Sequence, residues 1–279
     1  MDIESAYQSA IKFASSHYEN FPVISMLVPK SLRKHVAVIY WFARTADDFA
    51  DEGLLSADER IRKLDEFENR LTGLLNGNFN SPFEMALHST IGSKKLSHEH
   101  FYNLLKAFKQ DVVKKRYENF PALLNYCRHS ANPVGRLILE LNKIRNNDTF
   151  DLSDKICTAL QLTNFWQDTE IDYSKGRIYY PEDEMSSFGV TEKMFELREN
   201  NLNLMALVKH NVERTDNLFR EGENLIGHLS GRLKYEIKWT VLGGETILKK
   251  IKESNYDVLH VRPALNKKDF FILFLKSFL

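Results

Sequence analysis

The segment YWFARTADDFAD, residues 40–51, indicates the kind of fold that the chain adopts. Positions 40, 44, 47 and 51 are spaced by four, three and four residues, and on an α-helix this spacing places them on one face. That face starts with the ring of Tyr40, continues with the guanidinium of Arg44 and ends with the carboxylates of Asp47 and Asp51. We therefore predict a helix with an acidic stripe along one side.

A second segment, QLTNFWQDTEID at residues 161–172, repeats this arrangement. Gln161, Asn164, Asp168 and Asp172 fall on one face of a helix, and the two carboxylates lie one turn apart. Because the other faces are strongly apolar, we expect the acidic face to point inward, toward a cavity. The apolar neighbours are Leu160, Leu162, Phe165, Trp166 and Ile171.

Helical periodicity continues through most of the chain. Apolar residues recur at intervals of three and four in 31–50, 101–113 and 202–212, and stretches of strict alternation are scarce. Segment 173–190 contains KGRIYYPED and is expected to form an irregular loop or lid between two helices. No linker or composition shift marks a boundary, so we predict one all-α domain over residues 1–279.

Composition excludes several classes of protein. The 279 residues include 38 Lys and Arg against 38 Asp and Glu, which removes a general electrostatic case for nucleic-acid binding. The hydrophobic content of 43% argues against disorder. Cys127 and Cys157 cannot form a disulfide framework, which fits a reducing cytoplasm. We therefore expect a cytoplasmic protein without nucleic-acid partners.

The two ends of the sequence bear on membrane association. The N-terminus lacks a basic region followed by an apolar run, so we do not expect a signal peptide. The tail FFILFLKSFL, residues 270–279, is much shorter than the roughly 20 residues that span a bilayer. We interpret it as a last core helix, and a peripheral membrane contact is the alternative.

Other motifs are weaker. HisGluHis at 98–100 places its histidines on different sides of a helix, which is poor for zinc, and we interpret it as a solvated helix start. LysLysArg at 114–116 is interpreted as an exposed face, with Arg116 as a possible pocket residue. The sequence has no GxGxxG, Walker A, GxSxG or HExxH pattern.

The two acidic stripes together predict metal–diphosphate chemistry. One pair of acids on a helix is usually solvated surface charge, but two pairs with the same upstream pattern are less easily explained that way. Four carboxylates held around one cavity would repel one another unless cations lay between them. Mg²⁺ suits such a site, because it binds a few carboxylates and completes its shell with water and substrate phosphate oxygens. Arg44 and Arg177 are candidate partners for the same anion.

The pairing of YxxRxxDDxxD with QxxNxxxDxxxD, in this order, resembles the squalene/phytoene synthase family. The resemblance runs from about residue 10 to about residue 265, which is nearly the whole chain. Further matches are Arg116-Tyr117, Tyr126-Cys127, Val134-Gly135 and Gly176-Arg177-Ile178-Tyr179-Tyr180-Pro181.

This resemblance implies an all-α isoprenoid-synthase fold with a central active-site cavity, Mg²⁺ as cofactor and a prenyl diphosphate as substrate. It implies that Tyr40 and Arg44 act in catalysis together with the residues that hold Mg²⁺, which are Asp47, Asp51, Asn164, Asp168 and Asp172. It also implies that Arg44 and Arg177 hold diphosphate. The substrate-binding residues that it implies are Glu19, Asn20, Phe21, Tyr126, Val134, Gly135, Gln161, Arg177 and Arg262.

Two departures from the general family pattern resemble the hydroxysqualene synthase branch. Glu19-Asn20-Phe21 stands where most of the family has Lys-Ser-Phe, and Asn132-Pro133 precedes Val134-Gly135 where the family usually has Ala-Gly. Members of that branch ionise presqualene diphosphate and let water capture the carbocation. We hypothesise that Glu19 repels a second diphosphate and that Glu19 or Asn20 positions the water. The alternative is that Glu19 caps or solvates a helix end.

Two other functions remain open. A synthase that condenses two prenyl diphosphates to squalene or phytoene shares the stripes, and squalene formation would require NADPH, for which no dinucleotide motif is seen. A non-catalytic relative, which binds lipid or protein partners as an assembly factor, would be expected to lose the acidic stripes. Both stripes are intact in this chain.

Overall fold

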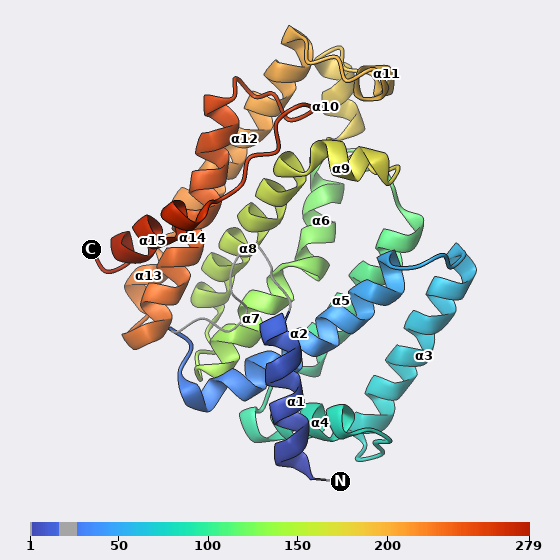
Figure 1. Cartoon of the computed structure of the whole chain (residues 1–279), viewed down its shortest axis with the longest axis vertical. Helices are drawn as coiled ribbons and strands as arrows, with labels where there is room; N and C mark the ends of the chain where they lie inside the picture. The colour runs from blue at the N-terminus through green and yellow to red at the C-terminus, as the bar shows by residue number, and fades with distance from the viewer. Residues whose placement is uncertain (1, 17–26) are drawn as a thin grey trace. The chain divides into compact units, whose positions relative to one another are not determined.

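The computed structural model describes residues 2–16 and 27–279. Over these residues the secondary structure consists of α-helices and no strand, which confirms the all-α prediction (Figure 1). The single domain stays a prediction, and the two compact units of the chain are described separately. Unit 1 is Met1–Val113 with Pro133–Phe150, and unit 2 is Lys114–Asn132 with Asp151–Leu279.

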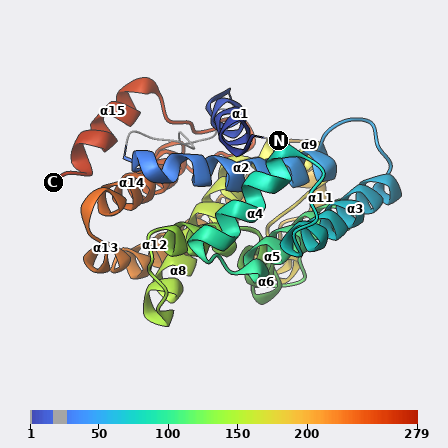
Figure 2. The same ribbon diagram turned by 90° about the horizontal axis from the view of Figure 1, so that it is seen from below.

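Helix α2 is the centre of unit 1, where it contacts α1, α3, α4 and α5 (Figures 1 and 2). It is 22 residues long, so the whole first stripe lies on one uninterrupted helix. The helices of unit 1 are α1 (Ile3–Ser16), α2 (Lys30–Asp51), α3 (Ala57–Leu75), α4 (Pro82–Lys94), α5 (His98–Val113) and most of α7 (Asn132–Leu141).

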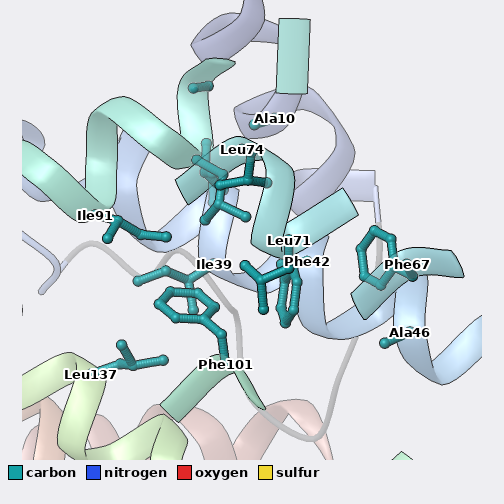
Figure 3. Close-up of a cluster of buried hydrophobic side chains, with 14 of the residues drawn as sticks. Ala10, Ile39, Phe42, Ala46, Phe67, Leu71, Leu74, Ile91, Phe101 and Leu137 are labelled. Atoms are coloured by element: carbon teal, nitrogen blue, oxygen red, sulfur yellow. The ribbon is translucent and has the colours of Figure 1, made fainter. Parts of the chain in front are cut away.

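The core of unit 1 fixes how α2 is rotated. Phe42 is buried, and its ring centroid lies 5.0 Å from that of Phe67 on α3 and 5.2 Å from that of Phe101 on α5 (Figure 3). Ile39 and Ala46 are buried on the same side of α2. Burial of each large apolar side chain contributes about 1.5–3 kcal/mol, so a rotation of α2 that exposed this side would be costly. The core therefore holds the stripe residues of α2 in a fixed direction.

The histidines at the start of α5 lie in two environments. His98 is exposed, but His100 is buried and its Nε2 lies 3.6 Å from Oε1 of buried Glu140. Glu140 also accepts a hydrogen bond from the backbone N–H of Ser97 at 2.9 Å. The prediction of a solvated helix start is therefore wrong for His100, because a carboxylate from α7 gives the buried imidazole a partner.

Unit 2 is built around α8 and the long pair α12 and α14. In this unit α14 contacts α12, α13 and α15 (Figure 1). Its helices are α6 (Phe120–Ser130), α8 (Asn147–Gln167, from Asp151 on), α9 (Thr169–Ser174), α10 (Glu182–Ser187), α11 (Glu192–Glu196), α12 (Leu202–Gly222), α13 (Leu225–His228), α14 (Gly231–Glu253) and α15 (Lys267–Lys276).

The segment predicted to be irregular, 173–190, is only partly so. Residues 175–181 form a loop, but α10 occupies 182–187, and this part of the prediction is wrong. The helix follows Pro181 and has Glu182, Asp183 and Glu184 in its first turn, where acidic side chains interact favourably with the exposed N–H groups. These are ordinary helix-start signals that the turn-rich loop before them obscured.

Helix α15 packs on α14 through one of its sides. Phe270 and Phe274 contact Trp239 of α14, with ring centroids 6.4 Å and 5.6 Å apart, and Leu273 is buried. The prediction of a core helix therefore holds for one side of α15 only, since Phe271 is 64% exposed. Among the described residues, no helix is both long enough and apolar enough to cross a bilayer.

Candidate active site

The first acidic stripe is organised around Arg44. Its guanidinium donates from Nη1 to Oδ2 of Asp47 at 3.2 Å, and its Nε lies 2.8 Å from Oδ1 of Asp48. Glu52, one residue beyond the end of α2, has Oε1 at 3.5 Å from Nη2. Arg44 is therefore paired with three carboxylates. The helical spacing predicts Asp47 as a site residue but not Asp48 or Glu52, although the adjacent acids in DDFADE are a visible signal.

The ends of this stripe lie where the helical spacing places them. Tyr40 is half-buried and packs against Phe13 of α1, with ring centroids 6.2 Å apart. Asp51 is the last residue of α2 and is also half-buried. Tyr40, Arg44, Asp47 and Asp51 thus lie along one continuous helix, as the spacing predicted.

The second stripe lies across the junction of α8 and α9. Helix α8 ends at Gln167, and Asp168 occupies the position before α9. The helical hydrogen-bond pattern nevertheless continues through the junction: the N–H of Asp168 donates to the carbonyl of Asn164, and the N–H of Asp172 to that of Asp168, both at 2.8 Å. Asn164, Asp168 and Asp172 are therefore still one turn apart.

Asp168 is held by two side chains. Asn164 donates from Nδ2 to Oδ2 at 2.9 Å, and Arg262 donates from Nε to Oδ1 at 2.6 Å. The Asp168 side chain is only 17% exposed, so these bonds compensate a carboxylate that is largely withdrawn from water. The structure thus brings together three of the predicted site residues, two from α8 and its end and one from the C-terminal segment.

Hydrogen bonds hold the segment around Arg262 in place beside its contact with Asp168. The side-chain Nε2 of Gln167 donates to the carbonyl of Pro263 at 2.6 Å, and Nη2 of Arg198 donates to the carbonyl of Leu259 at 2.7 Å. These two bonds fix the backbone on both sides of Arg262. The sequence analysis did not find Gln167 or Arg198, and no local pattern marks a contact with a segment so far along the chain.

Arg177 follows the second stripe in the loop 175–181. Its N–H donates to the carbonyl of Asp172 at 2.8 Å, and the side chains of both residues line a small pocket. The other residues that line this pocket are Phe165, Thr169, Ile178, Tyr179, Tyr180 and Phe195. Arg177 and Asp172 therefore share a recess of which half the lining residues are aromatic.

Arg116 is hydrogen-bonded to the loop 175–181. It donates from Nη1 to the carbonyl of Gly176 at 2.7 Å and makes a bidentate pair with Glu192 of α11, at 2.7 and 3.0 Å. Beside it, the N–H of Ile178 donates to the carbonyl of Lys115 at 3.1 Å. The interpretation of residues 114–116 as an exposed face holds only in part, since all three are half-buried and both Lys115 and Arg116 contact this loop.

Aromatic rings surround Tyr126, which is buried on α6. Phe165 and Tyr179 stack with centroids 3.6 Å apart, and Tyr126 lies within 6.3 Å of both rings. Nearby, burial raises the pKa of Tyr180, whose hydroxyl is hydrogen-bonded to Thr169 at 3.0 Å. The Tyr180 phenol is therefore neutral at ordinary pH and cannot act as a phenolate base.

The remaining predicted residues lie on α7, on α8 or outside the described residues. Val134 is 41% exposed and Gly135 is half-buried on α7, and Gln161 is half-buried on α8. The predicted residues Glu19, Asn20 and Phe21 lie outside the described residues. Their roles in substrate binding stay predictions.

A comparison with known proteins decides the family. Residues 14–269 match the family described as squalene/phytoene synthase, which is more than nine-tenths of the chain. The chain belongs to the squalene/phytoene synthase family. The family resemblance drawn from the two acidic motifs is thereby confirmed.

Three relatives indicate where in the squalene/phytoene synthase family the chain lies. A hydroxysqualene synthase of Zymomonas mobilis is 41% identical over 176 residues, which is 62% of this chain and 58% of that protein. A hydroxysqualene synthase of Rhodopseudomonas palustris is 33% identical over 78% of this chain and 74% of its own length. The crystal structure of squalene synthase HpnC from Alicyclobacillus acidocaldarius superposes with a TM-score of 0.86 at 35% identity, covering 91% of this chain and 95% of that one. This likeness confirms the all-α isoprenoid-synthase fold.

The stripe residues of this family member fit a divalent cation by their chemistry. Within the described part of the chain, no three His, Cys, Asp or Glu side chains are grouped as a metal site. Each stripe on its own offers two carboxylates one turn apart, and the Asp47 side chain is 43% exposed. Mg²⁺ binds one or two carboxylates and fills its octahedron with water and phosphate oxygens, so such a pair is a sufficient protein contribution.

Proposed function

We propose that the chain converts presqualene diphosphate and water to hydroxysqualene and diphosphate, with Mg²⁺ as cofactor. Its family acts on prenyl diphosphates. The observation that carries the proposal is that both acidic stripes are intact and arginine-paired in a chain 33–41% identical to two hydroxysqualene synthases. In this proposal Asp47, Asp51, Asn164, Asp168 and Asp172 hold the cation, which, when bound, supplies Lewis-acid stabilisation of the leaving diphosphate.

Three arginines are proposed to hold the diphosphate. Arg44 and Arg262 already make charge-assisted contacts to carboxylate oxygens, and Arg177 lies beside Asp172. Phosphate oxygens match the guanidinium fork as carboxylate oxygens do, so a diphosphate competes for the same donors. Donors aimed at the bridging and terminal oxygens stabilise the charge that develops as the C–O bond breaks.

The reaction needs no oxidant or reductant. The bond between the substrate carbon and the diphosphate oxygen breaks, and the electron pair leaves with diphosphate. The resulting cyclopropylcarbinyl cation opens its ring, water forms the new C–O bond, and a proton is lost to give the alcohol. The aromatic rings around Tyr126 are proposed to stabilise the cation by cation–π attraction and to delay its capture by excluding water.

Glu19 distinguishes this reaction from a condensation in our proposal. Most of the family has lysine at this position, and a carboxylate there would disfavour a second diphosphate. Substitution Glu19→Lys is expected to lower hydroxysqualene yield from presqualene diphosphate. An unchanged yield would remove Glu19 from the proposed mechanism.

The cell compartment is also a proposal. The sequence contains two cysteines, which form no disulfide in the structure, and Cys127 is buried and Cys157 half-buried. Burial raises the pKa of Cys127 to about 12, so its thiol is inert. Two cysteines without a disulfide suit the reducing cytoplasm, where we place the enzyme in bacterial squalene and hopanoid biosynthesis.

A condensing synthase is the second candidate, because the structural relative from Alicyclobacillus bears the name squalene synthase. Two incubations of the purified chain distinguish the two candidate functions, one with presqualene diphosphate and one with farnesyl diphosphate. Both contain Mg²⁺ and no NADPH. Hydroxysqualene from the first substrate only is expected. Presqualene diphosphate or a C30 hydrocarbon from the second would overturn the proposal, and no diphosphate release from any prenyl diphosphate would favour a non-catalytic relative.

A further inference from the structure

The outward side of α15 carries large apolar side chains that are exposed to solvent. Phe271 is 64%, Ile272 49% and Leu275 52% exposed. At about 100° per residue these three positions fall within one half of the helix circumference. Large apolar side chains gathered on one exposed face mark a candidate binding face.

The exposed side is not the result of a loosely held helix. On the opposite side Leu273 and Ser277 are buried, and Phe270 and Phe274 pack against Trp239 of α14. At its start, Asn266 forms a capping box with Asp269, whose carboxylate also lies 3.0 Å from Nζ of Lys250. These contacts hold α15 in one orientation and leave its apolar side pointing outward.

Lysines frame this apolar cluster. Lys267 and Lys268 lie at the start of α15 and Lys276 at its end, and all three are exposed. The carboxylate of α15, Asp269, belongs to the inward side, where it is paired with Lys250. The outward face therefore presents aromatic and aliphatic groups together with positive charge.

We propose that the outward face of α15 docks on the surface of an anionic lipid bilayer. Phe271, Ile272 and Leu275 would enter the boundary between headgroups and acyl chains, while the lysines extend to the phosphates. The three exposed lysines of α15, together with the pairing of Asp269 to Lys250, are the observation that favours an anionic surface over an uncharged apolar partner.

Docking by this face would place the second stripe near the lipid. Only residues 263–266 separate α15 from Arg262, which is bonded to Asp168. That stretch spans at most about 18 Å when extended. The inference goes beyond the proposed reaction, and it is tested by binding without any substrate, so the two can fail independently.

Co-sedimentation of the full chain with vesicles tests the docking face. We expect binding to phosphatidylcholine vesicles that contain phosphatidylglycerol, weaker binding to pure phosphatidylcholine, and loss of binding at high salt. A triple serine variant of the apolar cluster should lower the partition coefficient at least about tenfold. The substitutions are Phe271→Ser, Ile272→Ser and Leu275→Ser.

Matched controls separate this face from general surface effects. A variant with serine at three exposed leucines outside α15 should bind vesicles as the wild type does. A variant with glutamine at three exposed lysines outside α15 should also bind as the wild type does. Glutamine at Lys267, Lys268 and Lys276 should remove the preference for anionic vesicles. The control positions are Leu54, Leu197 and Leu202 for serine, and Lys12, Lys193 and Lys249 for glutamine.

Three results would overturn the proposal. The first is a wild-type chain that does not bind anionic vesicles. The second is a folded serine variant, by circular dichroism, that binds as well as the wild type. The third is self-association of the wild type that the serine variant abolishes, without vesicle binding in either, which would assign the face to a second copy of the chain.

Discussion

At the residue scale, an arginine lies against the carboxylates of each acidic stripe. Arg44 contacts Asp47 and Asp48, and Arg262 contacts Asp168. The Arg44–Asp47 pair is partly exposed, and such pairs contribute little to stability, typically less than about 1 kcal/mol. Their interest is chemical, because a guanidinium that binds a carboxylate can bind a phosphate with the same geometry.

Asp168→Asn tests the second stripe. The substitution keeps the size of the side chain and removes its charge, so we expect turnover of the prenyl diphosphate substrate to fall at least about 100-fold. The unfolding midpoint should change little, since the amide can still accept the bond from Arg262. Asp151→Asn, at an exposed position of the same helix, is the control. Turnover close to the wild type in Asp168→Asn would contradict a role in catalysis.

Glu245 makes stability depend on pH near neutrality. Burial, together with the negative charges of Glu223 and Asp216, raises the pKa of Glu245 from 4.5 to about 7. The folded chain therefore holds a proton that the unfolded chain releases, and this contribution to stability is complete below pH 4.5 and is lost as pH rises toward 7. Glu245→Gln should raise the free energy of unfolding above pH 7 by about 1–2 kcal/mol, after allowance for solvent screening.

Urea denaturation at a series of pH values measures this effect. The difference between Glu245→Gln and the wild type should vanish as pH falls well below 4.5, because the wild-type carboxyl is then protonated in both states. Glu253→Gln, exposed at the end of the same helix, should show no such pH dependence. A constant difference at all pH values would mean that the amide acts through packing and not through charge.

At the element scale, the spacing of the stripe residues predicted the first helix better than the second. Residues 40–51 lie within α2 without a break. Residues 161–172 cross from α8 to α9 at Asp168, and only the backbone hydrogen bonds to Asn164 and Asp168 preserve the predicted face. The periodicity of the sequence predicts which residues share a helix face. It does not predict a helix break of one residue across which the helical hydrogen bonds continue.

Contacts between distant elements could not be predicted from the sequence. Arg262 reaches Asp168, and Arg116 reaches the carbonyl of Gly176, across many intervening residues. Neither contact has a local pattern, and the resemblance to a family supplied Arg262 as a candidate without its partner. The central cavity between the two stripes stays a prediction as well.

The close packing of α14 on its neighbours is testable at a glycine. A Cβ at Gly244 would lie 2.5 Å from Cζ of Phe219 and 3.0 Å from Cδ2 of Leu160. Gly244→Ala should therefore destabilise the chain by about 1–3 kcal/mol through overpacking. Urea denaturation measures the change.

Gly92→Ala on α4 is the matched control, because a Cβ there meets nothing within 4 Å. This substitution should leave stability unchanged or raise it by up to about 1 kcal/mol, since alanine favours the helix over glycine. If Gly244→Ala and Gly92→Ala had the same effect, close packing at Gly244 would not be the cause.

At the scale of the whole molecule, the charge balance of 38 against 38 conceals an uneven distribution. Two acidic stripes, one in each compact unit, are paired with arginines, and α15 presents lysines with apolar side chains. A chain neutral in total thus carries sites for a cation, a diphosphate and an anionic surface in our proposals. Composition alone excluded general nucleic-acid binding and could not reveal these local sites.

Water capture is the central claim, and the oxygen in the product tests it most directly. In the experiment, the purified chain is incubated with presqualene diphosphate and Mg²⁺ in water enriched in a heavy oxygen isotope. The product is then analysed by mass spectrometry. We predict hydroxysqualene with one heavy oxygen atom in its hydroxyl group. A hydrocarbon product without oxygen, or an alcohol whose oxygen comes from the diphosphate, would contradict the proposed function.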